Sequence, residues 1–246
     1  MSGHSKWAKI KRGKAAEDAK RGAIFTKLGN SIAIAARRGG DPDLNPGLAL
    51  AIEKAKQANM PNANVERSIK RGTGELGGEM INEYTYEGYG PGGIAVIVEA
   101  ASDNKNRITT DVRTAFSKNG GNMAETGAVA FQFSRKGVIR LAVAGDMDEA
   151  ILSVLEAGAE DAFEADGELI VYTDMKQLHA ISDQLAKQDL KVLDADLQYV
   201  PNDSMMIEDE TTAKKALKLM DALEDIDDVT NTYTNFDIAD EIAEKL

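Results

Sequence analysis

The spacing of the apolar residues changes once along this chain, near residue 73, and this change limits the folds that the chain can adopt. Before that point, apolar residues recur every three or four positions, which is the period of an amphipathic helix. After it, segments that alternate apolar and polar residues appear between further helical stretches, and alternation is the period of a half-buried strand. The sequence therefore predicts an α+β protein whose N-terminal part is entirely helical.

Three helices are expected in the N-terminal part. The first occupies residues 15–38 and ends at a pair of glycines. A second helix starts at Asn45 and Pro46, which form an N-cap followed by proline at the first helical position. A third, short helix follows, and Gly72 is expected to close it in the left-handed conformation.

The sign of the charge changes where the apolar period changes. The chain carries 29 Lys and Arg against 41 Asp and Glu, a net charge of −12. Residues 1–72 hold 15 of these basic residues and only 6 of the acidic ones, so this part carries +9 and the rest of the chain −21. The segment 73–78 between the two parts has the composition of a linker. A basic region on an acidic body directs one face at polyanions and keeps the whole molecule soluble.

The elements predicted beyond the linker follow an order that divides this part of the chain in two. Strand, strand, helix and short strand come first, at residues 81–89, 94–101, 105–118 and 128–133. A strand-helix-strand-strand-helix-strand order follows, at residues 138–143, 146–157, 160–165, 168–173, 175–187 and 190–200. This second order is the complete ferredoxin-like arrangement. A last helix and strand, at 211–224 and 229–234, supply what the first unit lacks.

The predicted fold class is therefore α+β, with an N-terminal three-helix domain followed by two ferredoxin-like α+β domains, the last inserted into the middle one. The predicted domains are a basic three-helix domain at 1–76, a middle α+β domain at 77–134 plus 205–246, and an inserted ferredoxin-like α+β domain at 135–204.

Composition removes several classes of function. The chain has no cysteine, which removes disulfides, thiol catalysis and thiolate metal sites. Its two histidines, His4 and His179, lack the paired spacing of a metal site or a catalytic triad. No GxxxxGK[ST] phosphate loop is present, and the glycine-rich stretch at 88–93 is predicted to be a turn between two strands. We therefore expect no enzymatic activity, no metal, no cofactor and no small-molecule substrate.

The sequence also bears on location. No apolar run approaches the roughly 18 residues of a membrane span, so no membrane partner is expected. The charges at the N-terminus are not followed by a hydrophobic segment, so no secretory signal is visible. An organellar presequence is the alternative that a basic start allows, but Glu17 and Asp18 follow quickly. We expect a cytoplasmic protein that is monomeric in solution.

The strongest functional signal is a run of cations near the N-terminus. Residues 6–21 include seven Lys or Arg among sixteen residues, with Trp7 between them. Cations release condensed counterions when they neutralise phosphates, and an accessible Trp stacks on bases. Trp7 has a second interpretation, as a hydrophobic anchor for this arm. Further cations follow on the helices, where they face either a phosphate backbone or solvent. The predicted nucleic-acid-binding residues are Lys6, Trp7, Lys9, Lys11, Arg12, Lys14, Lys20, Arg21, Lys27, Arg37, Arg38, Lys70 and Arg71.

Three stretches of the sequence resemble one known family. They read GHSKWAKIKRGKAAEDAKRG, AARRGGDPDLNPGLALAIEKAKQANMP and ERSIKRGTGE, and the chain resembles YebC-type proteins over essentially its whole length. The resemblance implies an N-terminal helical bundle, two α+β domains around a cleft, and DNA binding in the regulation of transcription. The family's basic motif falls on Lys6, Lys9, Lys11, Arg12, Lys14, Lys20, Arg21 and Lys27. Ala63 departs from the pattern, because relatives carry an acidic helix cap there.

The family resemblance leaves two roles open. The first is a DNA-binding transcriptional regulator. The alternative is a ribosome-associated translation factor that binds ribosomal RNA and aids the synthesis of proline-rich stretches, as the family's mitochondrial translational activators suggest. A-form and B-form helices carry the same phosphate charge, so a surface that reads the backbone does not separate these two roles. A third hypothesis, a scaffold or enzyme centred on the acidic domains, lacks a nucleophile, a metal set and a phosphate loop.

Overall fold

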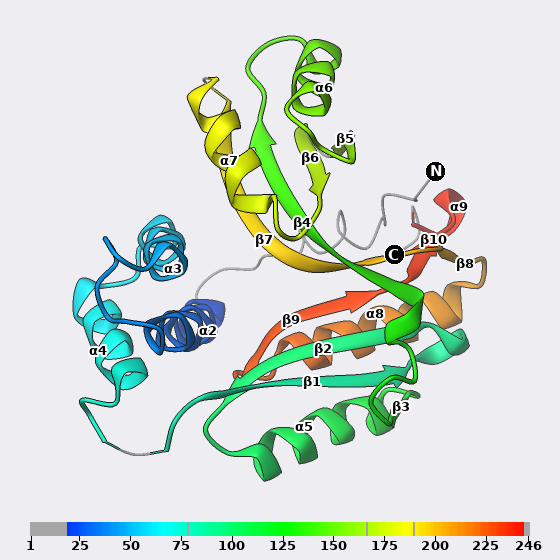
Figure 1. The fold of residues 1–246 in the computed structure, drawn as a ribbon. Coiled ribbons are helices and arrows are strands. Elements are labelled where there is room, and N and C mark those ends of the chain that lie inside the picture. The colour runs from blue at the N-terminus through cyan, green and yellow to red at the C-terminus, as the bar shows by residue number, and fades with distance from the viewer. Residues whose placement is uncertain (1–18, 78, 166, 189, 244–246) are drawn as a thin grey trace.

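The computed structural model describes residues 19–243 apart from residues 78, 166 and 189, and Figure 1 shows three bodies. Helices α2–α4 form the helical domain at one end, a four-stranded sheet with two helices forms the middle domain, and a second such sheet forms the inserted domain. The predicted α+β fold class is confirmed, including the insertion. The domain boundaries at residues 76, 134 and 204 stay a prediction. Among the described helices, none combines the length and the apolar character needed to cross a membrane.

The helical domain consists of α2 (Ala19–Ala36), α3 (Pro46–Gln57) and α4 (Asn62–Thr73). Asn45 caps α3 as predicted, since its side-chain oxygen accepts a hydrogen bond from the Leu48 amide at 3.2 Å. The Asn45 side-chain amide also donates to the carbonyl oxygens of Ala35 and Gly39, both at 2.8 Å. One side chain thus starts α3 and fixes it against the end of α2.

The predicted role of Gly72 is wrong. Gly72 lies inside α4 and is buried, and the left-handed residue that ends the helix is Gly74, with φ 84°. A Cβ added to Gly72 would lie 2.1 Å from the carbonyl oxygen of Ala33 in α2. Glycine is therefore required at this position because the backbones of α2 and α4 are in contact.

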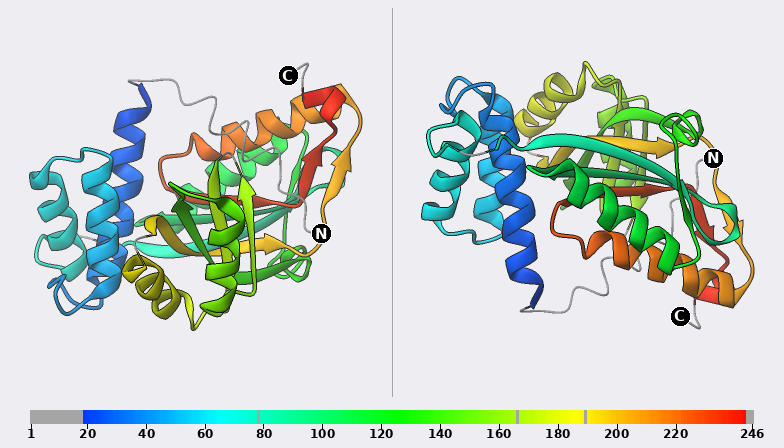
Figure 2. Two further views of the ribbon diagram at one scale, coloured as in Figure 1. Left: turned by 90° about the horizontal axis from the view of Figure 1, so that it is seen from above. Right: turned by 90° about the horizontal axis from the view of Figure 1, so that it is seen from below.

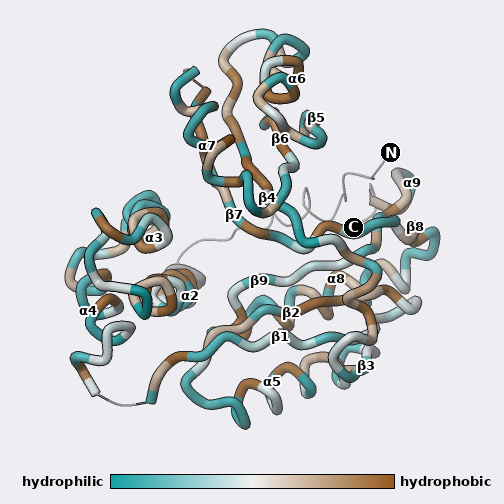
Figure 3. The backbone as a smooth tube through the Cα atoms, viewed as in Figure 1, coloured by the Kyte–Doolittle hydropathy of each residue, from teal (hydrophilic) through white to brown (hydrophobic). Residues whose placement is uncertain are grey.

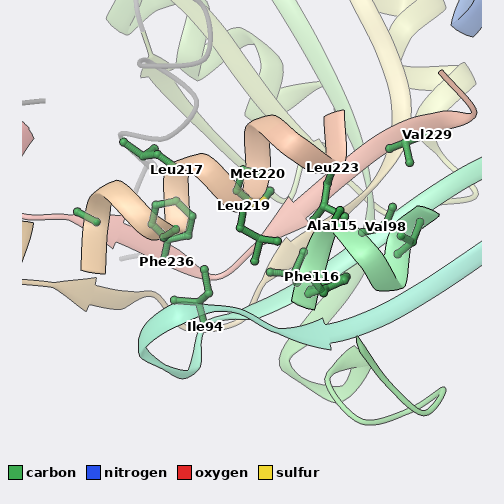
Figure 4. Close-up of a cluster of buried hydrophobic side chains, with 14 of the residues drawn as sticks. Ile94, Val98, Ala115, Phe116, Leu217, Leu219, Met220, Leu223, Val229 and Phe236 are labelled. Carbon is green, nitrogen blue, oxygen red and sulfur yellow. The ribbon is translucent and has the colours of Figure 1, made fainter. Parts of the chain in front are cut away.

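The middle domain has the strand order β3-β1-β2-β9. Its strands are β1 (Asn82–Tyr89), β2 (Ala95–Ser102), β3 (Asn122–Ala124) and β9 (Val229–Thr234). Helices α5 (Lys105–Lys118) and α8 (Glu210–Glu224) cover one face of this sheet (Figure 2). Between them lies a core that joins Val98 and Phe116 to Leu219 and Phe236, from widely separated parts of the chain (Figure 4).

The connections of the middle domain differ in part from prediction. The predicted turn at 88–93 is confirmed and contains a 3₁₀ helix, η1 (Pro91–Gly93). The predicted strand at 128–133 is wrong, because the segment forms a second 3₁₀ helix, η2 (Ala130–Gln132), and the short strand is β3. The buried carboxylate of Glu87 accepts hydrogen bonds from the amides of Val129 and Ala130, which a strand would need for its ladder. Three short elements were not predicted, namely the parallel pair β8 (Met205–Ile207) and β10 (Phe236–Ile238) and the helix α9 (Asp240–Ala243).

The inserted domain has the antiparallel strand order β5-β6-β4-β7 of a ferredoxin-like sheet. Its elements are β4 (Phe133–Ala142), α6 (Met147–Glu156), β5 (Asp161–Ala165), β6 (Glu168–Thr173), α7 (Leu178–Lys187) and β7 (Lys191–Pro201). Strand β4 starts earlier than the predicted 138, because it already pairs with β7 at Phe133 and Pro201. The two connections to the middle domain therefore lie side by side.

Candidate nucleic-acid interface

Eight of the predicted binding residues come first in the chain. Six of them lie outside the described residues, namely Lys6, Trp7, Lys9, Lys11, Arg12 and Lys14. Lys20 and Arg21 lie at the start of α2. The structure therefore bears mainly on the five cations that follow.

Lys27 is directed into the middle domain. Its ammonium group donates to the carbonyl oxygen of Glu224 at 2.5 Å, at the end of α8. The carbonyl end of a helix carries partial negative charge, so a cation is favoured there. One turn further along α2, the side-chain amide of Asn30 donates to the Ala101 carbonyl at 3.1 Å. These two residues attach α2 to the middle domain.

Arg71 is likewise held between the two domains. Its guanidinium lies 2.7 Å from the carboxylate of Asp103 and donates to the side-chain oxygen of Asn30 at 3.4 Å. Asp103 is shared with Arg107, which also lies 2.7 Å from Asp228. This network joins α4 to the end of the middle sheet and to α5. Arg71 is still partly exposed, with 41% of its side chain accessible.

The remaining described cations are exposed near the adjoining ends of α2 and α4. Arg37 and Arg38 follow α2, and Lys70 lies in the last turn of α4. The guanidinium of Arg37 also donates to the Ile81 carbonyl at 3.3 Å. A Cβ on Gly40 would lie 2.9 Å from the side chain of Thr73, which shows how closely the two ends approach. Hydrophilic colours predominate along α4 (Figure 3).

Sequence reasoning missed Arg67. It is exposed on α4, and the positions 67, 70 and 71 have the three- and four-residue spacing that places side chains on one face of a helix. This spacing could have identified Arg67 from the sequence. We call these four cations the basic end: Arg37, Arg38, Arg67 and Lys70.

Lys54 on α3 is engaged elsewhere. Its ammonium group lies between two carboxylates of β7, 2.8 Å from Asp194 and in contact with Asp196. Burial acts to lower the pKa of Lys54, but the two carboxylates outweigh it and the pKa is raised. Lys54 therefore links the helical domain to the inserted domain.

A second charged cluster lies where the inserted domain leaves the middle sheet. Glu99, on the face of β2 away from the helices, accepts hydrogen bonds from Arg135 at 2.5 Å and from the Tyr233 hydroxyl at 2.8 Å. The guanidinium of Arg135 also lies over the ring of Tyr199, 4.3 Å from its centre. Burial, and then the nearby Glu99, raises the pKa of Tyr233, which is the opposite of what a nucleophile or general base at neutral pH needs. This cluster braces two domains.

The cavity beside Arg107 does not extend the interface. It measures about 680 Å³, lies between α2, α5 and α8, and includes Arg107 and Lys118 among its walls. Its carboxylates outnumber these cations, with Asp111, Asp225, Asp227 and Asp228 all lining it. Acidic walls repel phosphates. Within the described part of the chain, no group of three His, Asp or Glu side chains is placed to hold a metal ion.

Comparison with known proteins gives concordant matches for both halves of the chain. Residues 5–75 match the family described as the TACO1/YebC protein N-terminal domain, and residues 81–236 match the TACO1/YebC second and third domain. A protein of Halothermothrix orenii named a probable transcriptional regulatory protein is 52% identical, over 100% of this chain and 99% of its own. A protein of Persephonella marina with the same name is 48% identical over the full length of both.

A solved structure has the same fold. The crystal structure of a conserved hypothetical protein from Aquifex aeolicus superposes with a TM-score of 0.89 at 44% identity. The match covers 97% of this chain and 99% of the other.

Proposed function

The chain belongs to the TACO1/YebC family, and from this membership we propose that it is a transcriptional regulator that binds DNA through its helical domain. The relatives named probable transcriptional regulatory proteins support a regulatory role. Under this proposal the protein acts in the cytoplasm, DNA is its partner, and no catalytic step is required.

The observation that carries the proposal is the separation of charge between the domains. The basic end projects from a part of the chain with net charge +9, while the remainder carries −21. Phosphates are attracted to the basic N-terminal part and repelled by the acidic remainder, so a duplex approaches the helical domain only. Arg and Lys side chains on helix ends suit phosphate oxygens, and contacts of this kind position a protein on the duplex without reading its sequence.

The attachment of the helical domain supports a regulatory role for this binding. Lys27, Asn30 and Arg71 fix α2 and α4 to the middle domain through hydrogen bonds and an ion pair. A duplex held at the basic end is therefore held in a defined orientation to the acidic domains, which remain free for other interactions.

The first test removes two cations of the basic end. We expect Arg67→Ala with Lys70→Ala to weaken binding to duplex DNA and to flatten the dependence of log K on log salt by about 0.9 for each phosphate that the variant no longer neutralises. The measurement is fluorescence anisotropy of a labelled duplex at several salt concentrations. The matched control is Lys215→Ala with Lys218→Ala, two exposed lysines of α8 on the acidic part of the chain.

An unchanged salt slope in the Arg67/Lys70 variant, or an equal weakening in the control, would contradict the assignment of the interface. Duplex RNA of the same sequence is measured in parallel. Tighter binding to RNA at equal salt, abolished in the same variant, would transfer the interface to the ribosomal alternative. Similar affinities for unrelated DNA duplexes are expected, because interactions with the phosphate backbone carry no sequence information.

A further inference from the structure

An exposed aromatic side chain marks the end of the molecule opposite the helical domain. Phe131 of η2 is 73% exposed, and Met205 and Met206 of β8 are 38% and 50% exposed. Strand β8 lies at the far end from α2–α4 in every view (Figures 1 and 2). Large apolar side chains on the surface of a folded protein mark interaction sites when they adjoin one another and a cavity.

The loop that carries Phe131 is rigidly held from its N-terminal side. The carboxylate of Glu87 is buried and accepts three backbone hydrogen bonds, from Gly127 at 2.6 Å, Val129 at 2.7 Å and Ala130 at 2.8 Å. The hydroxyl of Tyr89 donates to the Ala128 carbonyl at 2.8 Å. Burying a carboxylate costs free energy unless it accepts hydrogen bonds. The Glu87 carboxylate and the three amides therefore stabilise one conformation of this loop.

Asn202 holds the same loop from the other side. Its backbone amide donates to the Gln132 carbonyl at 2.8 Å, and its side-chain amide donates to the Phe131 carbonyl at 3.2 Å. Its side-chain oxygen accepts from the Ser134 hydroxyl at 2.6 Å. The backbone of Phe131 is thus fixed while its side chain projects outward. A loop whose backbone is held in place before binding loses little entropy when a partner arrives.

A cavity of about 220 Å³ opens beside Phe131. It is lined by Phe131, Gln132, Asn202, Asp203, Ser204, Met205 and Asn235. Pockets for drug-sized ligands and cofactors start at about 300 Å³, so this cavity fits a single side chain better than a nucleotide.

We propose that Phe131, Met205 and this cavity form a docking surface for a protein partner, which inserts one apolar side chain flanked by Lys or Arg. The charge of the surroundings selects this partner. Asp203 lines the cavity, and Glu208 and Asp209 are exposed directly after β8. Phosphates are repelled by such a rim, whereas a basic segment of a protein is attracted to it and is steered to the exposed apolar centre.

The test places a photo-crosslinking p-benzoylphenylalanine at position 131 of the full chain in living cells. The matched control carries the crosslinker at Leu152, which is 62% exposed on α6 of the inserted domain. We expect a protease-sensitive, nuclease-resistant adduct from position 131 only, in which the cross-linked peptide contains an apolar residue beside Lys or Arg. Adding Asp203→Lys should lower the yield of this adduct about tenfold, because it reverses a charge at the rim.

Three results would overturn the proposal: an adduct that nuclease removes, equal adducts at positions 131 and 152, or a yield that Asp203→Lys leaves unchanged. Thermal melting and DNA titration of each variant are run alongside. Both should match the unmodified protein, since the surface lies far from the basic end. Failure of this docking surface is thereby distinguished from failure of DNA binding.

Discussion

Cations that look equivalent in the sequence lie in three different environments. Lys54 and Arg71 sit against carboxylates of other domains, Lys27 caps the end of α8, and Arg38 and Lys70 are exposed. Their sequence neighbours do not differ in a way that separates these roles, because each partner comes from a distant part of the chain. The basic character of the helical domain could be predicted, but which cations face solvent depends on the tertiary fold.

Gly72 provides a test at the same scale. We expect Gly72→Ala to lower the free energy of unfolding by about 1–3 kcal/mol, because the new Cβ would overlap the Ala33 carbonyl and push α4 away from α2. Gly22 is the control, since it lies in α2 with no atom within 4 Å of an added Cβ. Gly22→Ala should stabilise by about 0.5–1 kcal/mol through helix propensity. Urea denaturation measures both, and equal effects would refute the packing role of Gly72.

At the scale of elements, local signals predicted most of the helices and strands. The bounds of α3, α5 and β9 follow from caps, glycines and apolar period, which are properties of neighbouring residues. The predictions are wrong where contacts with residues distant in the sequence determine the secondary structure. The segment 128–133 has the composition of a strand, yet the Glu87 carboxylate binds its amides and it forms η2 instead. Likewise, the pair β8 and β10 is too short for a periodic signal.

The three backbone hydrogen bonds that Glu87 accepts predict a second effect on stability. Glu87→Gln should lower the free energy of unfolding by about 1–3 kcal/mol, because an amide presents only one acceptor oxygen to three backbone donors and leaves a buried group unpaired. Glu83→Gln, at an exposed position of the same strand, should be nearly neutral. Hydrogen exchange should speed up at Gly127, Val129 and Ala130 in the Glu87 variant alone. Unchanged exchange there would show that the carboxylate does not hold the loop.

At the scale of the whole molecule, the three bodies are tied together in different ways. The helical domain is fixed to the middle domain by Lys27, Asn30 and Arg71. The inserted domain continues from the middle domain through β4 and β7 and is braced at its base by Glu99 and Arg135. Lys54 alone among these residues bridges the helical and inserted domains. The angle of the inserted domain should therefore depend on this link.

Removing the link should change that angle. Lys54→Met keeps the length of the side chain but leaves Asp194 and Asp196 to repel each other, so we expect the inserted domain to move away from α3 at a cost of about 1–2 kcal/mol. Spin labels on α4 and α7 would report the distance between the two domains. Lys56→Met, on the exposed side of α3, is the control. An unchanged label distance in the Lys54 variant would contradict the link.

The same labels test the pH dependence. The folded-state pKa of Lys54 is raised above the ordinary 10.5, so the stability that this raised pKa contributes is present at neutral pH and is lost as pH rises from 10.5 through the folded pKa. No change is expected at neutral or mildly acidic pH from this residue.

The core of the middle domain is built from widely separated parts of the chain, and this affects how the protein folds during its synthesis. Strands β1 and β2 and helix α5 leave the ribosome before Leu219 and Phe236, which complete their core (Figure 4). The inserted domain is contiguous in sequence and has all its strands earlier, so it is free to fold first. A chain that breaks off before α8 leaves the apolar side of β2 bare, and bare apolar surface is what chaperones and proteases act on. A copy that stops before α8 therefore cannot close this core.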